Sequence, residues 1–185
     1  MPVGLAMLLA LLIGTGFGLI SGLLVTKGRL QPFIATLITM TVYRGLTMIF
    51  MDGKPISNLG DSFFLKLVGK GNLFNIPIPV ILFLVVFAVF VFVLEKTTFG
   101  RRIYATGSNW KSAKLAGVNI DLTKMAAYAI SGCMAAVSGL ILLSRLGSAQ
   151  PTLGDGYELD AIAAVALGGT SMNGGRGRIW KTFVG

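Results

Sequence analysis

The sequence predicts an all-α, polytopic membrane helix bundle, and two observations lead to this prediction. Of the 185 residues, 54% are hydrophobic and 12% are charged, whereas soluble domains carry about a quarter charged residues. Four apolar runs are each long enough to cross the hydrocarbon core of a bilayer, which is about 30 Å thick. A soluble globular fold is therefore excluded.

The four predicted transmembrane helices are residues 3–25, 33–51, 78–94 and 125–144. At about 1.5 Å per residue, each one reaches across most or all of the hydrocarbon layer. All six prolines lie at or outside the ends of these runs, where a missing backbone N–H costs little. The first run lacks a preceding basic segment and is too long for a signal peptide, so we expect it to be a retained helix.

A fifth apolar run, residues 161–169, would be only about 14 Å long as a helix, so we expect a half-length or re-entrant helix. Glu158 and Asp160 precede it, where carboxylates oppose the positive end of a helix dipole; a contact to a ligand or an extracellular partner is the alternative. Glycines free the backbone for non-helical turns, which at membrane depth must be covered by protein or line water. The glycines in question are Gly168, Gly169, Gly174, Gly175 and Gly177.

The charges of the connecting loops predict the orientation. Residues 26–32 and 95–124 together carry eight basic and two acidic residues. Residues 52–76 and 145–160, on the opposite side of four successive crossings, carry four basic and five acidic residues. Because cytoplasmic loops are enriched in Lys and Arg, we expect the first pair of loops to be cytoplasmic.

The basic residues of the C-terminal tail do not fit this orientation. Arg176, Arg178 and Lys181 would lie outside if the fifth run enters the membrane and returns. An external location of these side chains contradicts the positive-inside rule. The topology of residues 161–185 therefore stays open at this stage.

The residue content argues against catalytic, metal-binding and nucleotide-binding roles. The chain has no His, one cysteine (Cys133) and no Asp or Glu within the four apolar runs, so we expect no catalytic, metal or cofactor site. Residues 169–174 have the GxxxxG spacing of a phosphate-binding loop, but Gly175 and Arg176 stand where Lys and Ser or Thr are required. The basic residues lie between apolar runs, which indicates membrane loops and no nucleic-acid partner.

Two features lie within the predicted helices. Arg44 sits near the middle of the second run, where a charge needs a partner, water or a route to the interface. One interpretation is that Arg44 lines a water-filled path or holds two helices together. The other is that its long stem extends toward the lipid headgroups. Gly14, Gly18 and Gly22 place a glycine stripe on the first helix; ordinary close packing is favoured over a sliding interface.

The 95–124 loop contains signals of a short helix. Asn109 is a candidate N-cap, and Gly117 is a natural residue for ending a helix. Ala113 lies between them in a short helical stretch. On composition alone, a basic loop with a small helix is typical of a membrane surface that meets anionic lipid.

Three longer stretches carry a family resemblance that covers about residues 18–185. They are KGRLQPFIATL, FGRRIYATGSNWKSAKLAGVNI and RLGSAQPTLGDGYELDAIAAVALGGTSMNGGRGRI. With these motifs the chain resembles the membrane permease subunit of bacterial carbohydrate ABC importers, in the ribose-type branch of the ribose and branched-chain amino acid permease family. Family members carry further helices at both ends, so the resemblance implies that residues 1–185 form a partial permease domain.

The resemblance implies a multi-pass protein of the bacterial inner membrane that forms the pathway for a ribose-like sugar. It implies an ATP-binding cassette subunit that binds the ATP, an external sugar-binding protein and a second permease copy. The 95–124 loop would hold the helix that couples to the ATPase, with Gly107, Asn109, Ala113 and Gly117 as its residues. Residues 155–180 would lie toward the extracellular side. Candidate pathway or gating residues are Arg44, Glu158, Asp160, Gly168 and Gly169.

Two other classes of function were weighed against import. A secondary carrier or channel without an ATPase favours inverted repeats and intramembrane carboxylates, and the four runs contain neither. An intramembrane enzyme needs a nucleophile with a base, or paired acids, at membrane depth. The absence of His and of carboxylates in the runs disfavours the enzyme most strongly.

Overall fold

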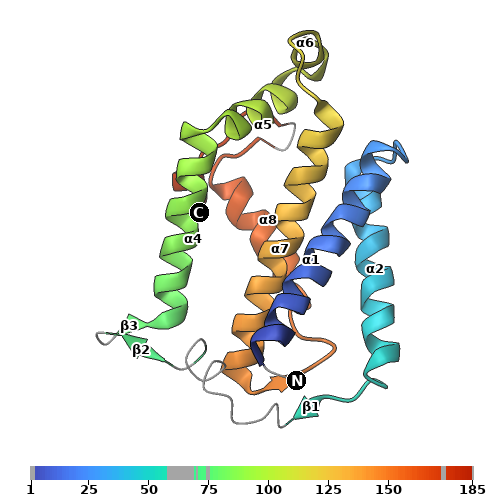
Figure 1. The fold of residues 1–185 in the computed structure, drawn as a ribbon, viewed down its shortest axis with the longest axis vertical. Coiled ribbons are helices and arrows are strands. Elements are labelled where there is room, and N and C mark those ends of the chain that lie inside the picture. The colour runs from blue at the N-terminus through green and yellow to red at the C-terminus, as the bar shows by residue number, and fades with distance from the viewer. Residues whose placement is uncertain (1–2, 58–68, 70, 74–75, 172–173, 185) are drawn as a thin grey trace. The chain divides into compact units, whose positions relative to one another are not determined.

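The computed structural model describes residues 3–57, 69, 71–73, 76–171 and 174–184. Figure 1 traces the chain. The chain divides into two compact units. Unit 1 comprises Met1–Ile81 and Met125–Leu153, and unit 2 comprises Leu82–Lys124 and Gly154–Gly185. Asp61, Lys66 and Lys70, which enter the charge balance above, lie outside the described residues.

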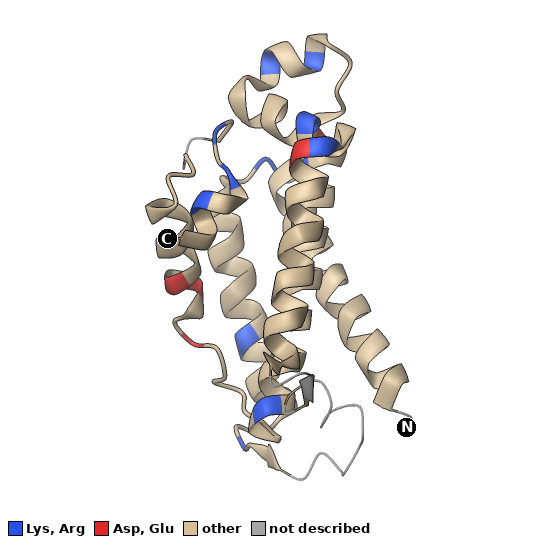
Figure 2. Ribbon diagram, turned by 90° about the vertical axis from the view of Figure 1, so that its left-hand side faces the viewer, with Lys and Arg blue, Asp and Glu red and all other residues tan. Residues whose placement is uncertain are grey.

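Four long apolar helices dominate the described residues, and each is long and apolar enough to cross a membrane. They are α1 (Val3–Thr26), α2 (Pro32–Phe50), α4 (Ile78–Lys96) and α7 (Ile120–Leu146). In Figure 2 these helices are free of charged residues over most of their length. The predicted all-α membrane bundle with four spanning helices is confirmed.

The other helices that the structure describes in full are short. They are α5 (Thr98–Ser108), α6 (Trp110–Leu115), α8 (Tyr157–Leu167) and α9 (Ile179–Val184). The 11 residues of α8 span only about 16 Å, so the predicted half-length helix is present, although it begins four residues before the apolar run. Neither α5 nor α9 was predicted from the sequence.

Helix α7 begins five residues earlier than predicted. Asn119 precedes it, and its side-chain oxygen accepts a hydrogen bond from the backbone N–H of Leu122 at 3.0 Å. This cap stabilises a polar first turn, which contains Asp121 and which hydropathy alone does not reveal.

In unit 1 the glycine stripe of α1 packs directly on α7. A Cβ added at Gly14 would lie 2.6 Å from the Cβ of Ala136, and one at Gly18 would meet the backbone of Tyr128. From the other side, Gly132 of α7 approaches the backbone of α1 equally closely. Small residues thus allow the two backbones to touch, which is the packing use of such stripes in membranes.

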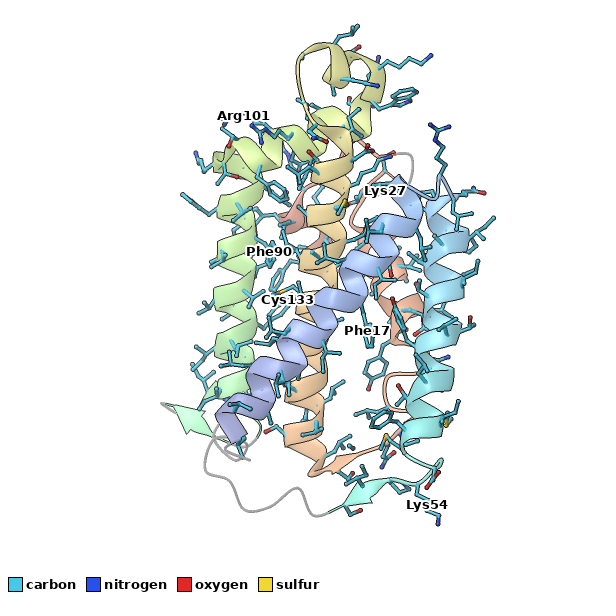
Figure 3. All side chains as sticks on the ribbon, turned by 45° about the vertical axis from the view of Figure 1, so that its right-hand side comes forward. Phe17, Lys27, Lys54, Phe90, Arg101 and Cys133 are labelled. Carbon is cyan, nitrogen blue, oxygen red and sulfur yellow. The ribbon has the colours of Figure 1, made fainter. Side chains whose placement is uncertain are left out.

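Unit 1 also joins α1 to α2 by polar and aromatic contacts. The hydroxyls of Ser21 and Thr39, both buried, are hydrogen-bonded at 3.2 Å. The rings of Phe17 and Tyr43 stack with centroids 4.3 Å apart, and Figure 3 shows Phe17 on the α1 side of this contact. The Tyr43 hydroxyl donates to the Phe17 backbone oxygen at 3.0 Å, so the helix pair is fixed at two depths.

In the described part of unit 1, four two-residue strands form two small antiparallel pairs. β1 (Ile56–Ser57) pairs with β4 (Ser148–Ala149), and β2 (Asn72–Leu73) pairs with β3 (Ile76–Pro77). The first pair ties the segment after α2 to the segment after α7. The second pair directly precedes α4.

In unit 2 an aromatic cluster links α4 to α9. The Phe87 ring lies 4.9 Å from Trp180 in an edge-on arrangement and 5.0 Å from Phe183. Phe83, one turn earlier on α4, stacks with Phe183 at 6.0 Å. Such aromatic pairs contribute beyond the apolar area that they bury.

Candidate functional site

Helix α5 begins at a tight turn after α4. The Thr97 hydroxyl accepts a hydrogen bond from the Gly100 backbone N–H at 3.3 Å and donates to the Val93 oxygen at 2.6 Å. A Cβ at Gly100 would collide with the backbone of Leu94, so the turn requires glycine at this position. The N-cap threonine is the local signal that could have predicted α5.

Helix α6 is capped at both ends by the two predicted residues. The Asn109 side-chain oxygen accepts from the backbone N–H groups of Lys111 and Ser112 at 3.1 and 3.2 Å. Gly117 has a φ of 80°, and its N–H donates to the Lys114 oxygen at 3.0 Å. The N-cap at Asn109 and the helix end at Gly117 are therefore confirmed, the latter in the arrangement of a Schellman motif.

The surface of α6 combines one buried small residue with exposed apolar ones. Ala113 is 5% exposed, whereas Trp110 is 55% and Leu115 is 91% exposed. The Lys111 ammonium lies 5.6 Å from the centre of the Trp110 ring. The helix therefore presents apolar and cationic groups outward from a fixed position.

The glycine-rich segment after α8 folds into a closed turn. The backbone N–H of Ser171 donates to the Arg176 oxygen at 2.8 Å, and the N–H of Gly174 donates to the Ser171 oxygen at 3.0 Å. Gly174 and Gly175 have φ values of 86° and 75°. Only glycine adopts successive positive φ angles at low cost, so these residues are required by the turn itself.

This turn packs backbone to backbone on the C-terminal end of α5. A Cβ added at Gly107 would lie 2.5 Å from the Gly175 nitrogen, and one added at Gly175 would lie 2.5 Å from the Ser108 Cα. One turn earlier on α5, the Tyr104 hydroxyl donates to the Gly177 oxygen at 2.9 Å. We name this contact the glycine joint; it consists of Tyr104, Gly107, Ser108, Gly174, Gly175 and Gly177.

The glycine joint bears on the predicted topology. The loop charges predict that residues 95–124 are cytoplasmic, and the family resemblance implies that residues 155–180 lie toward the extracellular side. Since Gly175 touches Ser108, both expectations cannot hold for residues 174–177. The physical reason is that α8 is followed by a turn that returns to α5. A cytoplasmic joint also places Arg176 and Arg178 on the side that the positive-inside rule favours.

Helix α8 is ended by the two glycines singled out from the sequence. The N–H of Gly169, whose φ is 72°, donates to the Ala166 oxygen at 2.9 Å. A Cβ at Gly168 would lie 2.6 Å from the Cα of Thr182 in α9, so this glycine allows close helix contact. Glu158 and Asp160 lie in the first turn of α8, as the dipole interpretation requires.

An open cleft of about 740 Å³ adjoins the glycine joint in unit 2. Its walls are mainly apolar side chains of α4, α5, α8 and α9, and the two arginines of the glycine-rich segment also line it. The residues that bear on the site are Phe87, Ile103, Tyr104, Val165, Arg176 and Arg178.

The predicted pathway residues are divided between the two units. Arg44 belongs to unit 1, where it is half-buried on α2 and has an interaction partner. Glu158, Asp160, Gly168 and Gly169 belong to unit 2. Cys133 is a free, partly buried thiol in α7. Across the described ranges no three His, Cys, Asp or Glu side chains are grouped to hold a metal ion.

Comparison with protein families identifies the family of the chain, which the geometry alone does not. The family model described as the permease component of the branched-chain amino acid transport system matches residues 1–185. The chain belongs to this permease family. Membership and the four apolar helices make it a multi-pass protein of the bacterial inner membrane. No solved structure matches the chain.

Several curated relatives are sugar permeases by name. The chain is 52% identical over 165 residues to the ribose import permease protein RbsC of Bacillus subtilis (strain 168), covering 89% of this chain and 51% of the relative. It is 48% identical to the protein of the same name from Haemophilus influenzae, and the match covers 100% of this chain and 58% of the relative. It is 41% identical to the L-arabinose transport system permease protein AraH of Escherichia coli K12, and the match covers 90% of this chain and 50% of the relative. The chain thus spans about half the length of these relatives.

Sequence reasoning missed the glycine joint as a unit. It singled out Gly107, Gly174, Gly175 and Gly177 but assigned them to opposite sides of the membrane. It did not single out Tyr104, since one tyrosine in a basic loop carries no local signal of a partner 73 residues away.

Proposed function

We propose that the chain is part of the transmembrane subunit of an ATP-driven importer for a ribose-like monosaccharide. The observation that carries this proposal is the 48–52% identity to two proteins named ribose import permease, over nearly the whole of this chain. The family model supports the same class of transporter. The subunit performs no chemistry: ATP is bound by a separate ATP-binding cassette subunit, and this chain holds no cofactor.

Helix α6 is the proposed contact with the ATPase. It is fixed at its ends by Asn109 and Gly117, so its side chains are presented at low conformational cost. Trp110 and Leu115 are exposed apolar side chains of the kind that fill pockets at protein interfaces. Lys111 and Lys114 add positive charge beside them. Ala113 is buried and anchors the helix to the chain.

The pathway roles of Arg44, Glu158, Asp160, Gly168 and Gly169 belong to the proposal as well. Arg44 supplies a cation within a spanning helix, where a water-filled route is one reason for its presence. Gly168 and Gly169 end α8 at a close contact with α9, where a small backbone change would redirect α8. An external sugar-binding protein and a second copy of the permease complete the proposed assembly, with the lipid bilayer around it.

Retention of an ATP-binding cassette subunit tests the coupling role. The chain, and the same chain extended to the length of its relatives, are co-purified with candidate ATPase subunits. Leu115→Asp places a charge on the most exposed apolar side chain of α6 and is expected to lower retention at least tenfold. Leu122→Asp is the matched control, because Leu122 is also an exposed leucine, at 61%, but belongs to α7.

Each outcome bears on a different part of the proposal. Loss of retention in Leu115→Asp alone supports docking through α6. Equal retention by both variants shows that α6 is not the contact. If the extended chain retains no ATPase subunit, import driven by ATP is wrong and a secondary carrier or channel replaces it.

A further inference from the structure

We propose that the glycine joint transmits movement of the α5–α6 loop to helix α8, so that ATPase docking and the short helix change position together. This inference rests on the proposed function for its role in transport. It concerns a contact, between α5 and the glycine-rich turn, to which neither the family match nor the named relatives give a task. Tyr104, Gly107 and Gly175 act in it as positioning residues.

The first step is the path from α6 to α5. Asn109 is at once the C-cap of α5 and the N-cap of α6, so a single residue separates the two helices. Its side chain binds the first turn of α6, while its backbone N–H donates to the Ala105 oxygen at 3.1 Å. A displacement of α6 therefore reaches α5 without a flexible linker.

The second step is the contact between α5 and the glycine-rich turn. Atoms at 2.5 Å from the position of a Cβ leave no room for a methyl group at Gly107 or Gly175. Backbone is in contact with backbone on both sides, so no side-chain rotation can absorb a movement. The Tyr104 hydroxyl, on the same face of α5 one turn earlier, holds the Gly177 oxygen and prevents the turn from swinging away.

The third step leads from the turn to α8. The turn is closed by the hydrogen bond from Ser171 to Arg176, and Gly177 lies against the Thr170 side chain. Thr170 lies three residues after the end of α8, and its N–H donates to the Val165 oxygen within the last turn of that helix at 3.2 Å. The chain of contacts from α6 to α8 is therefore continuous, as mechanical coupling between two sites requires.

The functional test compares three substitutions in the extended permease, assembled with its ATPase subunit. Gly107→Ala inserts a methyl group into the joint. Tyr104→Phe removes the hydroxyl that bonds to the Gly177 oxygen and adds no atom. Gly139→Ala is the matched control, because a Cβ there meets nothing within 4 Å. We expect the joint variants to retain the ATPase subunit but to lose about fivefold or more of the stimulation by ribose-loaded binding protein.

A second measurement is independent of the ATPase. Hydrogen exchange of the purified permease in detergent reports the protection of the α8 amides, including those of Ala164 and Gly168. Gly107→Ala and Tyr104→Phe are expected to raise exchange in α8 at least fivefold, and Gly139→Ala to leave it unchanged. Tyr104→Phe serves this purpose even if Gly107→Ala does not fold.

The two readouts separate this inference from the proposed function. Unchanged α8 exchange in a folded joint variant overturns the inference, as does full stimulation in the reconstituted assembly. If the unsubstituted permease binds no ATPase but α8 exchange responds to the joint, the proposed function fails and the intramolecular coupling stands.

Discussion

The Tyr104 hydroxyl donates a hydrogen bond to the Gly177 backbone oxygen at 2.9 Å and so joins two residues 73 positions apart. Among the described residues, no other tyrosine hydroxyl is seen to join α5 to the glycine-rich turn. Beside it, Gly107 and Gly175 touch through their backbones. A loop predicted to be cytoplasmic and a segment predicted to be extracellular are thereby held together.

Removal of the Tyr104 hydroxyl should lower stability modestly. Tyr104→Phe deletes one partly buried hydrogen bond, and we expect the free energy of unfolding to fall by about 1 kcal/mol. Tyr157→Phe is the control, since the Tyr157 ring is 54% exposed at the start of α8. Thermal unfolding in detergent measures both. Equal stabilities of the two variants would show that the Tyr104 bond contributes nothing.

The α1–α7 contact should tolerate no side chain at Gly18. A methyl group there meets the backbone of Tyr128, so Gly18→Ala forces the helices apart and should cost about 1–3 kcal/mol. Gly16, on the same helix, has open space within 4 Å of an added Cβ. Gly16→Ala should be neutral or stabilise the helix by up to about 1 kcal/mol. Unfolding of both variants in one detergent decides the matter; a neutral Gly18→Ala would refute the close packing.

The caps of α6 should be required for its order. Asn109→Ala removes two hydrogen bonds at the helix start and should cost about 1 kcal/mol of local stability, whereas Asn109→Asp retains an accepting oxygen. Hydrogen exchange of the Ala113 amide reports the change, because this N–H bonds to the backbone oxygen of Asn109 in the first turn of α6. Faster exchange in Asn109→Asp than in Asn109→Ala would contradict the capping role.

Two threonines near α5 should respond oppositely to the same substitution. The Thr106 hydroxyl is buried and finds no hydrogen-bond partner within the described part of the chain, so Thr106→Val should be neutral or stabilising. The Thr97 hydroxyl makes two bonds at the start of α5, and Thr97→Val should cost about 1 kcal/mol. Unfolding experiments on the pair provide their own control. A larger loss from Thr106→Val would reveal a partner for that hydroxyl.

The parts of the fold that could be predicted are those with local causes. The spanning helices follow from apolar runs of sufficient length, and α6 follows from Asn109 and Gly117, whose effects act within one helical turn. Helix α5 was missed because five of its residues are Thr, Gly or Ser and two are Arg, so no apolar run marks it. The five-residue extension of α7 depends on a cap, which hydropathy does not register.

The glycine joint could not be predicted because its cause is not local. The glycines indicate that the backbone turns or approaches another segment, but they do not indicate which segment. The partner of Gly175 is fixed by the path of the chain through α8 and the closed turn that follows. For the same reason, the loop charges left open the side on which Arg176 and Arg178 lie, and the resemblance placed residues 155–180 toward the extracellular side, although Gly175 packs on α5.

Sugar uptake by the reconstituted importer tests the central claim most directly. The permease extended to the length of its relatives is placed in proteoliposomes with its ATPase subunit and binding protein, and uptake of labelled ribose is measured with ATP, without ATP and with a non-hydrolysable analogue. We predict uptake that requires ATP hydrolysis and the binding protein, and that Leu115→Asp abolishes. Equal ribose uptake without ATP, or without the binding protein, would contradict ATP-driven import.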